Sequence, residues 1–183
     1  MKKMYVKKIQ IDNLKSFSKI LLSTIETKYK INYVEKSLFY LESNKILEQN
    51  TIVKKTLEDL NMLNYITAYA VVCMPKYRSP IHIDIGPFTH TFNIPLLGCN
   101  NTFIYHFSRP NKMEKIYFKD NKKNSYYLIK DEDCKCVSKF ETNQPYFMSV
   151  KQPHRFENPN EAPRIMLLCR LNNECINEHK FTN

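Results

Sequence analysis

The sequence is poor in glycine: its 183 residues contain only two glycines, and they contain no tryptophan. Tight corners must therefore be made by other residues, and Asn and Asp are those that best tolerate a left-handed backbone. We expect Asn100-Asn101 and Asp120-Asn121 to form such corners. Long apolar runs are also missing, since no stretch approaches the roughly 18 uninterrupted apolar residues of a membrane span. The sequence therefore predicts no membrane-spanning helix.

The N-terminal stretch, residues 1–8, is basic but has no apolar core, so it does not resemble a signal peptide. We therefore expect a cytoplasmic protein in which the six cysteines stay reduced. Cys73 and Cys169 lie in apolar runs, where a free thiol behaves as a small hydrophobic side chain. Only Cys134 and Cys136 are closely spaced, and a single CxC pair does not define a zinc site.

The net charge of +10 allows two interpretations. A basic surface attracts nucleic acid. The lysines, however, are spread along the chain without an arginine–aromatic stripe, which favours an ordinary solvated surface. A nucleic-acid partner thus stays open without being favoured, a membrane partner is not expected, and the oligomeric state is not indicated.

The length and the hydrophobic content of 43% suit one domain with a sizeable core. Residues 1–64 form a helical buttress in this interpretation, with amphipathic helices over 13–30 and about 44–63. Residues 65–171 are rich in β-prone residues, and residues 172–183 form a polar tail. Short strands are expected at 4–12, 33–41, 65–74, 81–85, 91–97, 102–107, 115–119, 125–130, 136–141, 146–150 and 164–171.

This order of elements predicts a mostly β protein with N-terminal helices. Many short strands that follow helices are typical of two facing antiparallel sheets. We expect a double-stranded β-helix (a jelly-roll of the cupin type), buttressed by two or three helices.

The run Ile81-His82-Ile83-Asp84-Ile85 alternates strictly between apolar and polar residues. Successive side chains of a strand point to opposite faces, so His82 and Asp84 share one face and the isoleucines share the other. An imidazole and a carboxylate held in this way suit a divalent metal, and a second histidine would complete the facial triad of non-haem iron(II). The alternative is a buried His–Asp pair that only orders the sheet.

His154, seventy residues after Asp84, is the candidate third ligand. Arg164 follows ten residues later and opens an apolar strand in which it alternates with Met166 and Leu168, so it is expected to point inward. A buried guanidinium needs an anion, and its planar fork suits a carboxylate. The intervening residues 157–163 have turn composition, and we expect His154 and Arg164 to stand opposite each other on a hairpin.

This pattern resembles the signature of iron(II)- and 2-oxoglutarate-dependent oxygenases over residues 65–171: an HxD pair, a distant histidine, and an arginine ten residues beyond it. The sequences around residues 93–96 and 153–158 are similar to the aspartyl/asparaginyl β-hydroxylase and proline hydroxylase branch. Met166 stands where the family often has Ser or Thr, so a second hydrogen bond to the 2-oxoglutarate tail must come from elsewhere. Thr91 and Asn93 stand where the β-hydroxylases often have Arg and His.

The resemblance implies a dioxygenase that hydroxylates an amino-acid or peptidyl side chain while 2-oxoglutarate is decarboxylated to succinate and CO2. His82, Asp84 and His154 would bind Fe(II) and leave positions for 2-oxoglutarate and O2, and Arg164 would bind the distal carboxylate of 2-oxoglutarate. Asn93 and Tyr105 are further candidates for contacts to the cosubstrate or to the metal ligands; otherwise Asn93 makes a strand-end hydrogen bond and Tyr105 is a core aromatic.

Two other functional classes stay open. A cupin-type metal protein with isomerase or epimerase chemistry would use Arg164 for a carboxylate or phosphate of its substrate. A catalytically silent binding module on the same fold, one for nucleic acid included, would need no turnover.

Overall fold

The fold is described from a computed structural model, which covers residues 6–29, 38–42, 55, 58–59, 65–117 and 125–171. The helical segment expected over 44–63 lies almost entirely outside the described residues. The tail over 172–183 lies entirely outside them. The corner expected at Asp120-Asn121 also lies outside them, and Asn101, in the other corner, does adopt a left-handed backbone with φ 55°. No helix in the described part of the chain has the length and apolar character needed to cross a bilayer.

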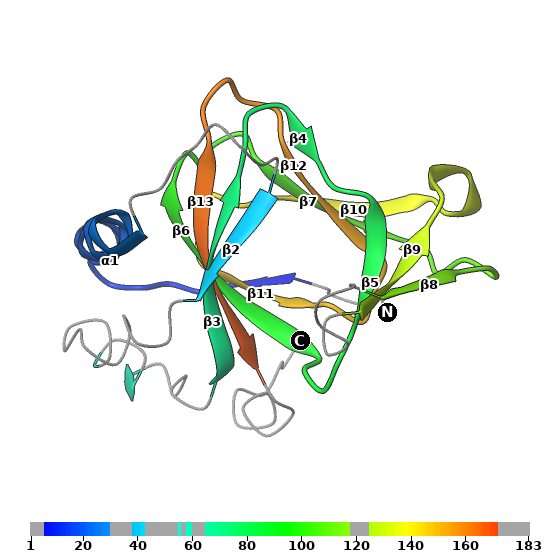
Figure 1. The fold of residues 1–183 in the computed structure, drawn as a ribbon, viewed down its shortest axis with the longest axis horizontal. Helices are drawn as coiled ribbons and strands as arrows, with labels where there is room; N and C mark the ends of the chain where they lie inside the picture. The colour runs from blue at the N-terminus through cyan, green and yellow to red at the C-terminus, as the bar shows by residue number, and fades with distance from the viewer. Residues whose placement is uncertain are drawn as a thin grey trace.

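Two antiparallel sheets form the body of the molecule (Figure 1). The six-stranded sheet has the order β1(Val6–Lys8), β11(Tyr146–Ser149), β6(His90–Leu97), β13(Arg164–Leu171), β3(Tyr65–Cys73), β2(Leu38–Glu42). The seven-stranded sheet has the order β10(Cys136–Glu141), β7(Phe103–Phe107), β12(His154–Asn158), β5(Ile81–Ile85), β9(Ser125–Ile129), β8(Glu114–Tyr117), with β4(Tyr77–Arg78) also paired to β12. The chain repeatedly crosses between the two sheets, as from β5 to β6 to β7. The predicted cupin-type double sheet is confirmed.

The hairpin expected between His154 and Arg164 is wrong. β12 belongs to the seven-stranded sheet and β13 to the six-stranded sheet, so the turn-like residues 159–163 carry the chain from one sheet to the other. Buried Asn158 holds this crossing, because its side-chain amide donates to the carbonyls of Cys73, Met74 and Ala162. Strand β12 itself has no counterpart among the strands expected from the sequence, since prolines flank it on both sides.

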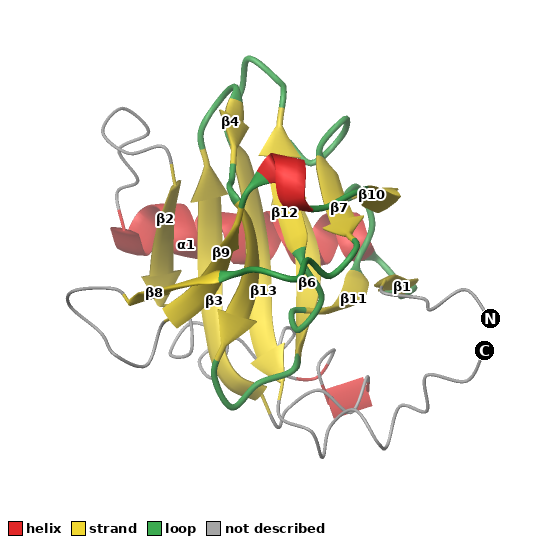
Figure 2. Cartoon of the chain, turned by 90° about the vertical axis from the view of Figure 1, so that its right-hand side faces the viewer, coloured by secondary structure: helices red, strands yellow, loops and turns green. Residues whose placement is uncertain are grey.

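Helix α1(Leu14–Tyr29) confirms the helix predicted over 13–30 and covers the outer face of the six-stranded sheet. Figure 2, turned by 90°, shows the helix behind the strands. The hydroxyl of Ser18 donates to the carbonyl of Pro95 at 2.8 Å and fixes the helix to β6. The apolar side chains of this layer include Phe17, Leu21 and Ile25 of the helix and Phe92, Ile94 and Leu167 of the sheet.

The space between the sheets holds a second core cluster, which includes Phe88, Ile104, Tyr146, Met148 and Met166. A third cluster, with Ile81, Ile83, Phe107 and Ile129, covers the outer face of the seven-stranded sheet. Both faces of each sheet are therefore packed, and polar side chains between the sheets are enclosed by apolar layers. Gly98 lies at the end of β6 with φ 62°, and a Cβ there would clash with the carbonyl oxygen of Pro163. This corner therefore requires glycine.

Candidate metal centre and its pocket

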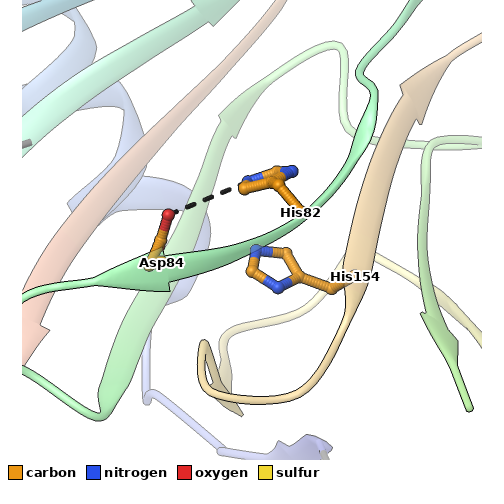
Figure 3. Close-up of side chains that lie close together, drawn as sticks. All are labelled: His82, Asp84 and His154. Carbon is orange, nitrogen blue, oxygen red and sulfur yellow. Dashed lines mark ion pairs between the residues drawn. The ribbon is translucent and has the colours of Figure 1, made fainter. Parts of the chain in front are cut away.

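His82 and Asp84 share the inner face of β5, as the alternation predicts. Ile81 and Ile83 are buried on the outer face. The Nδ1 of His82 lies 2.9 Å from the carbonyl oxygen of Pro80, which can only accept, so Nδ1 carries the proton. The bare Nε2 lies 3.9 Å from Oδ1 of Asp84 (Figure 3). A backbone hydrogen bond of this kind is what sets the tautomer of a metal-binding histidine.

His154 comes from β12, and the sheet register pairs it directly with His82. Its Nδ1 donates to the carbonyl of Gln152 at 2.9 Å, which leaves Nε2 as the ligand atom here too. The two imidazole centroids lie 4.3 Å apart. Figure 3 shows the three side chains gathered together, and one ligand atom from each lies within 4.8 Å of the other two. The structure thus brings the predicted triad together.

His154 is held in the form that binds metals. Burial lowers its pKa well below the usual value, and the neighbouring His82 lowers it further. The imidazole is therefore neutral near pH 7, and a neutral imidazole is the ligand form.

Lys151 links the two ligand strands. Its ammonium donates to the carbonyls of Asp84 and Gly86, each at 3.0 Å, and the backbone N–H of Asp84 donates to the carbonyl of Val150 at 3.1 Å. Burial lowers the pKa of Lys151. The loop that precedes His154 is thereby tied to the end of β5 that carries Asp84.

Arg164 reaches the same cavity from the opposite sheet. Only 4% of it is exposed. Its Nη2 donates to the sulfur of Met166 at 3.0 Å, and its buried Nε has no hydrogen-bond partner among the described residues. No carboxylate of the described residues pairs with this guanidinium, which cannot be deprotonated in a protein. The inward orientation that the sequence predicts is confirmed, although it arises from the facing sheet and not from a hairpin.

The cavity between the sheets has an empty volume of about 630 Å³, which includes open solvent at its mouth. Asn93 lines the cavity, and its amide donates to Oγ1 of Thr91 at 2.9 Å; its contact to the cosubstrate or to the metal ligands stays a prediction. The lining is otherwise largely apolar and includes Val71, Ile104, Met148, Val150, Phe156, Met166 and Leu168.

The structure corrects the prediction that Tyr105 contacts the cosubstrate or the metal ligands. It alternates along β7 with Ile104, which lines the cavity, and so it points to the outer face of the sheet. Its hydroxyl donates to Oε2 of Glu157 at 2.7 Å. Burial, with help from Glu157, raises the pKa of Tyr105 to about 12. Tyr105 therefore does not reach the site.

Tyr146 is the pocket residue that sequence reasoning missed. It is 1% exposed, lines the cavity, and its hydroxyl donates to the sulfur of Met166 at 3.3 Å, so it shares this acceptor with Arg164. Burial raises the pKa of Tyr146, and the charge of Arg164 opposes this only in part. The available signal was the spacing of Tyr146 and Met148 on one face of a strand.

His106 also faces inward, in register with His154, at a ring-centroid distance of 6.4 Å. It is fully buried, and burial lowers its pKa to about 4. It is not part of the triad. Among the described residues no other group of three or more His, Cys, Asp or Glu side chains could hold a metal, and Cys134 and Cys136 are free thiols.

The comparisons with known proteins are distant. No protein-family model matches the chain, and no curated protein matches its sequence. Solved structures that resemble the fold include an oxalate oxidase in complex with glycolate, with 11% identity and a TM-score of 0.39 over 76% of this chain and 53% of that chain. Oxalate decarboxylase from Bacillus subtilis has 12% identity and a TM-score of 0.37 over 79% and 28%.

A cupin domain of an XRE-family transcriptional regulator from Enterobacter cloacae has 8% identity and a TM-score of 0.33 over 74% of this chain and 97% of that domain. The chain spans about half the length of the oxalate oxidase and about a quarter of that of the decarboxylase. The fold assignment rests on the sheet order and register described above. They define a cupin-type β fold with a candidate metal triad inside it.

Proposed function

We propose that this chain is an Fe(II)- and 2-oxoglutarate-dependent dioxygenase that hydroxylates an amino-acid or peptidyl side chain. One observation carries the proposal: a buried arginine that has no anionic partner among the described residues lines the same cavity as a two-histidine, one-carboxylate triad. A metal alone would account for the triad. The arginine adds the need for a small anion beside that metal.

The triad fits Fe(II) in its donor set. Two neutral imidazoles and one carboxylate are the facial set of non-haem iron(II) enzymes, and three protein ligands leave positions open. Both imidazoles are oriented by backbone carbonyls, at Pro80 and Gln152. Such supporting hydrogen bonds keep the ligand atoms directed into the site when no metal is bound.

The other wall fits the distal carboxylate of 2-oxoglutarate. Arg164 offers a planar fork, including the Nε–H, which has no hydrogen-bond partner within the described ranges. The hydroxyl of Tyr146, now donated to the weak sulfur acceptor of Met166, is free to turn to a better acceptor. Tyr146 would thereby donate the second hydrogen bond to the 2-oxoglutarate tail, which Met166 cannot donate because it has no hydroxyl.

When bound, iron(II) and 2-oxoglutarate would supply the oxidising chemistry: O2 is consumed, 2-oxoglutarate is converted to succinate and CO2, and one oxygen atom enters the substrate. The protein's own residues bind and orient. His82, Asp84 and His154 hold the metal, Arg164 and Tyr146 fix the cosubstrate, and the apolar lining excludes water.

The remaining parts of the proposal concern partners and location. The substrate is a small molecule or a peptide segment, a nucleic-acid partner is not favoured by the dispersed charge, and the chain acts in the cytoplasm. A reducing compartment would keep the iron ferrous and the buried thiols free. Burial raises the pKa of Cys169 to about 12, so this thiol stays protonated.

The test is anaerobic addition of Fe(II) and 2-oxoglutarate to the purified protein. We expect a weak visible charge-transfer band and, after O2 is admitted, slow succinate release without any added substrate. His82→Ala should abolish both signals. His90→Ala is the matched control, because His90 is partly buried and does not line the cavity. It should keep both signals.

Absence of both the band and the succinate would refute the dioxygenase. The isomerase or epimerase alternative would then be supported if a divalent metal still bound in a His82-dependent manner. A band without succinate formation under any substrate tried would favour the silent binding module.

A further inference from the structure

Thr91 and Asn93 form a polar pair on the inner face of β6. Each is only 2% exposed, and both line the cavity. The amide nitrogen of Asn93 lies 2.9 Å from Oγ1 of Thr91 and 3.4 Å from the carbonyl oxygen of the same residue. A carbonyl oxygen can only accept, so the nitrogen of the Asn93 amide, and not its oxygen, faces Thr91. The pair is thereby fixed in one orientation.

This orientation leaves one acceptor and one donor for a ligand. The amide oxygen of Asn93 accepts no hydrogen bond from any described residue. Oγ1 of Thr91 accepts from Asn93, so its own proton is left to donate, and the described part of the chain supplies no acceptor for it. In a largely apolar cavity, polar groups without partners cost free energy. The pair therefore suits a ligand that both donates and accepts a hydrogen bond.

The Thr91 end of β6 lies on the same side of the cavity as the metal ligand Asp84. The backbone N–H of Asp84 donates to the carbonyl of Val150 at 3.1 Å, and the N–H of Val150 donates to the carbonyl of Thr89 at 3.0 Å. Thr89 precedes Thr91 by two residues in the chain. A group bound at Thr91 is therefore near the triad.

Arg164 lies farther along the six-stranded sheet. Asn93 pairs in register with Leu168, which follows Arg164 by four residues on β13. At about 3.3 Å of rise per residue, this offset along the strand is about 13 Å. The polar pair and Arg164 are therefore two separate places in the cavity.

The hydrogen-bonding groups of 2-oxoglutarate do not complement the polar pair. Its two carboxylates and its keto group only accept hydrogen bonds, so they could take the proton of Thr91 but would face the oxygen of Asn93 with a second acceptor. An amide has both an N–H and a carbonyl, so it satisfies the donor and the acceptor together. An amide is also uncharged, so no charge has to be buried with it.

We propose that Thr91 and Asn93 form an amide-binding subsite for the primary substrate. The oxygen of Asn93 accepts from an N–H of the substrate, and the hydroxyl of Thr91 donates to a carbonyl of the substrate. The inference rests on the proposed function in one respect, namely that 2-oxoglutarate occupies the Arg164 end of the cavity. It assigns Asn93 to the substrate in place of the cosubstrate, and it narrows the substrate to a molecule with an uncharged amide near the position that is oxidised.

The experiment measures the NMR relaxation of small probes with the full chain loaded with Mn(II) and 2-oxoglutarate. The probes are acetamide, acetone and acetate, which share one heavy-atom shape but differ in donors and charge. Mn(II) speeds the relaxation of methyl protons that bind close to it, so the signal reports both binding and location, and Mg(II)-loaded protein gives the baseline. We expect acetamide to bind near the metal at least about fivefold more tightly than acetone.

Two variants remove one hydrogen-bonding group each at nearly constant size. Asn93→Leu removes the acceptor and Thr91→Val removes the donor, and each should weaken the binding of acetamide about fivefold. The affinities for Mn(II) and 2-oxoglutarate should stay within about twofold. Asn111→Leu is the matched control, because Asn111 is exposed and does not line the cavity, and it should change no affinity. Thermal unfolding shows whether each variant folds, and Thr91→Val is the milder change if Asn93→Leu does not.

Three results with the probes would overturn the subsite: equal binding of acetamide and acetone, an acetamide affinity that neither variant lowers, or tighter binding of acetate that depends on Thr91 or Asn93. A loss of 2-oxoglutarate affinity in Asn93→Leu would overturn it too, because Asn93 would then belong to the cosubstrate. If the wild type binds no 2-oxoglutarate at all while acetamide still binds near Mn(II) in an Asn93-dependent manner, the proposed dioxygenase fails and the amide subsite stands.

Discussion

Two arginines of equal burial lie on opposite sides of the seven-stranded sheet, and they differ in their partners. Arg155 and Arg164 are each 4% exposed. Arg155 points to the outer side, where its Nε donates to the carbonyl of Ser79 at 2.9 Å. Its two terminal nitrogens donate to the two carboxylate oxygens of Asp131, at 2.9 and 2.5 Å. Every nitrogen of this guanidinium has an acceptor.

Arg164 lies on the inner side, in the cavity, and no carboxylate of the described residues pairs with it. Its Nη2 donates to a thioether sulfur, which is a weak acceptor, its other polar neighbours are Cys99 and Tyr146, and its Nε has no partner among the described residues. Burying a charge in this way costs free energy unless something compensates for it. Arg155 therefore serves the fold, and the difference supports the proposal above that Arg164 binds an anion in the cavity.

The largest expected effect is on the affinity for 2-oxoglutarate, which should depend on Arg164 and not on Arg155. Arg164→Met should weaken 2-oxoglutarate about 100-fold, because it removes a bidentate charged contact. Arg155→Met should leave that affinity nearly unchanged. Calorimetric titration of the Mn(II)-loaded proteins measures both values. Equal losses in the two variants would contradict the assignment of Arg164 to the cosubstrate.

The same two variants should differ in the opposite sense in stability. Arg155→Met should lower the free energy of unfolding by about 1–2 kcal/mol, because three hydrogen bonds are lost, two of them to a carboxylate that is 62% exposed and therefore screened. Arg164→Met should leave stability unchanged or raise it, since an apolar side chain replaces a buried charge that has no anionic partner in the described part of the chain.

Urea denaturation of the metal-free proteins measures both free energies of unfolding. If Arg164→Met proved the more destabilising of the two, Arg164 would be a structural residue like Arg155, and the contrast between them would disappear.

The sequence was informative wherever a side chain's orientation follows from strand alternation. The shared face of His82 and Asp84 depends only on a period of two residues, and the inward direction of Arg164 was inferred from the apolar Met166 and Leu168 that share its face; the structure bears out both placements. Tyr105 fails on the same rule, because the rule says which residues share a face but not which face is the inner one. Fixing that choice required a neighbour of known side, namely Ile104.

The rest depended on contacts between distant parts of the chain. The turn-like residues 159–163 are equally compatible with a hairpin and with a crossing between sheets, and the buried Asn158 that favours the crossing bonds to carbonyls more than eighty residues away. Nothing in the local sequence distinguishes Arg155 from Arg164 either. Their difference is decided by Asp131, which lies 24 residues before Arg155 and reaches only one of them.

A smaller effect tests the role of Tyr146 beside Arg164. Tyr146→Phe should weaken 2-oxoglutarate by about three- to tenfold, because one hydroxyl hydrogen bond is lost while the ring still fills its place. Stability should change little, since the hydroxyl donates to a sulfur, which is a weak acceptor. Calorimetric titration with 2-oxoglutarate measures this loss. The matched control is Tyr105→Phe, because the hydroxyl of Tyr105 lies outside the cavity and donates to Glu157. Equal affinities for wild type and Tyr146→Phe would remove Tyr146 from the site.

The smallest expected effect is a loss of stability in acid, and it involves the Arg155 pair and not Arg164. The hydrogen bonds from Arg155 lower the pKa of Asp131 below its usual value of 3.8, so the ionised carboxylate is favoured in the folded state. A depressed pKa contributes stability that is fully present above the unfolded pKa and is lost as the pH falls through the folded pKa.

Because Asp131 is 62% exposed, solvent screening limits this contribution to about 0.5 kcal/mol. Unfolding of wild type and Asp131→Asn should therefore differ most near pH 7 and converge as the pH falls below about 4. In a protein that already carries Arg155→Met, adding Asp131→Asn should produce no difference in stability that changes with pH in this way. A gap that stayed constant with pH would show that the carboxylate acts through its shape and hydrogen bonds. The contrast between Arg155, which is paired with a carboxylate, and Arg164 would then rest on Arg164 alone.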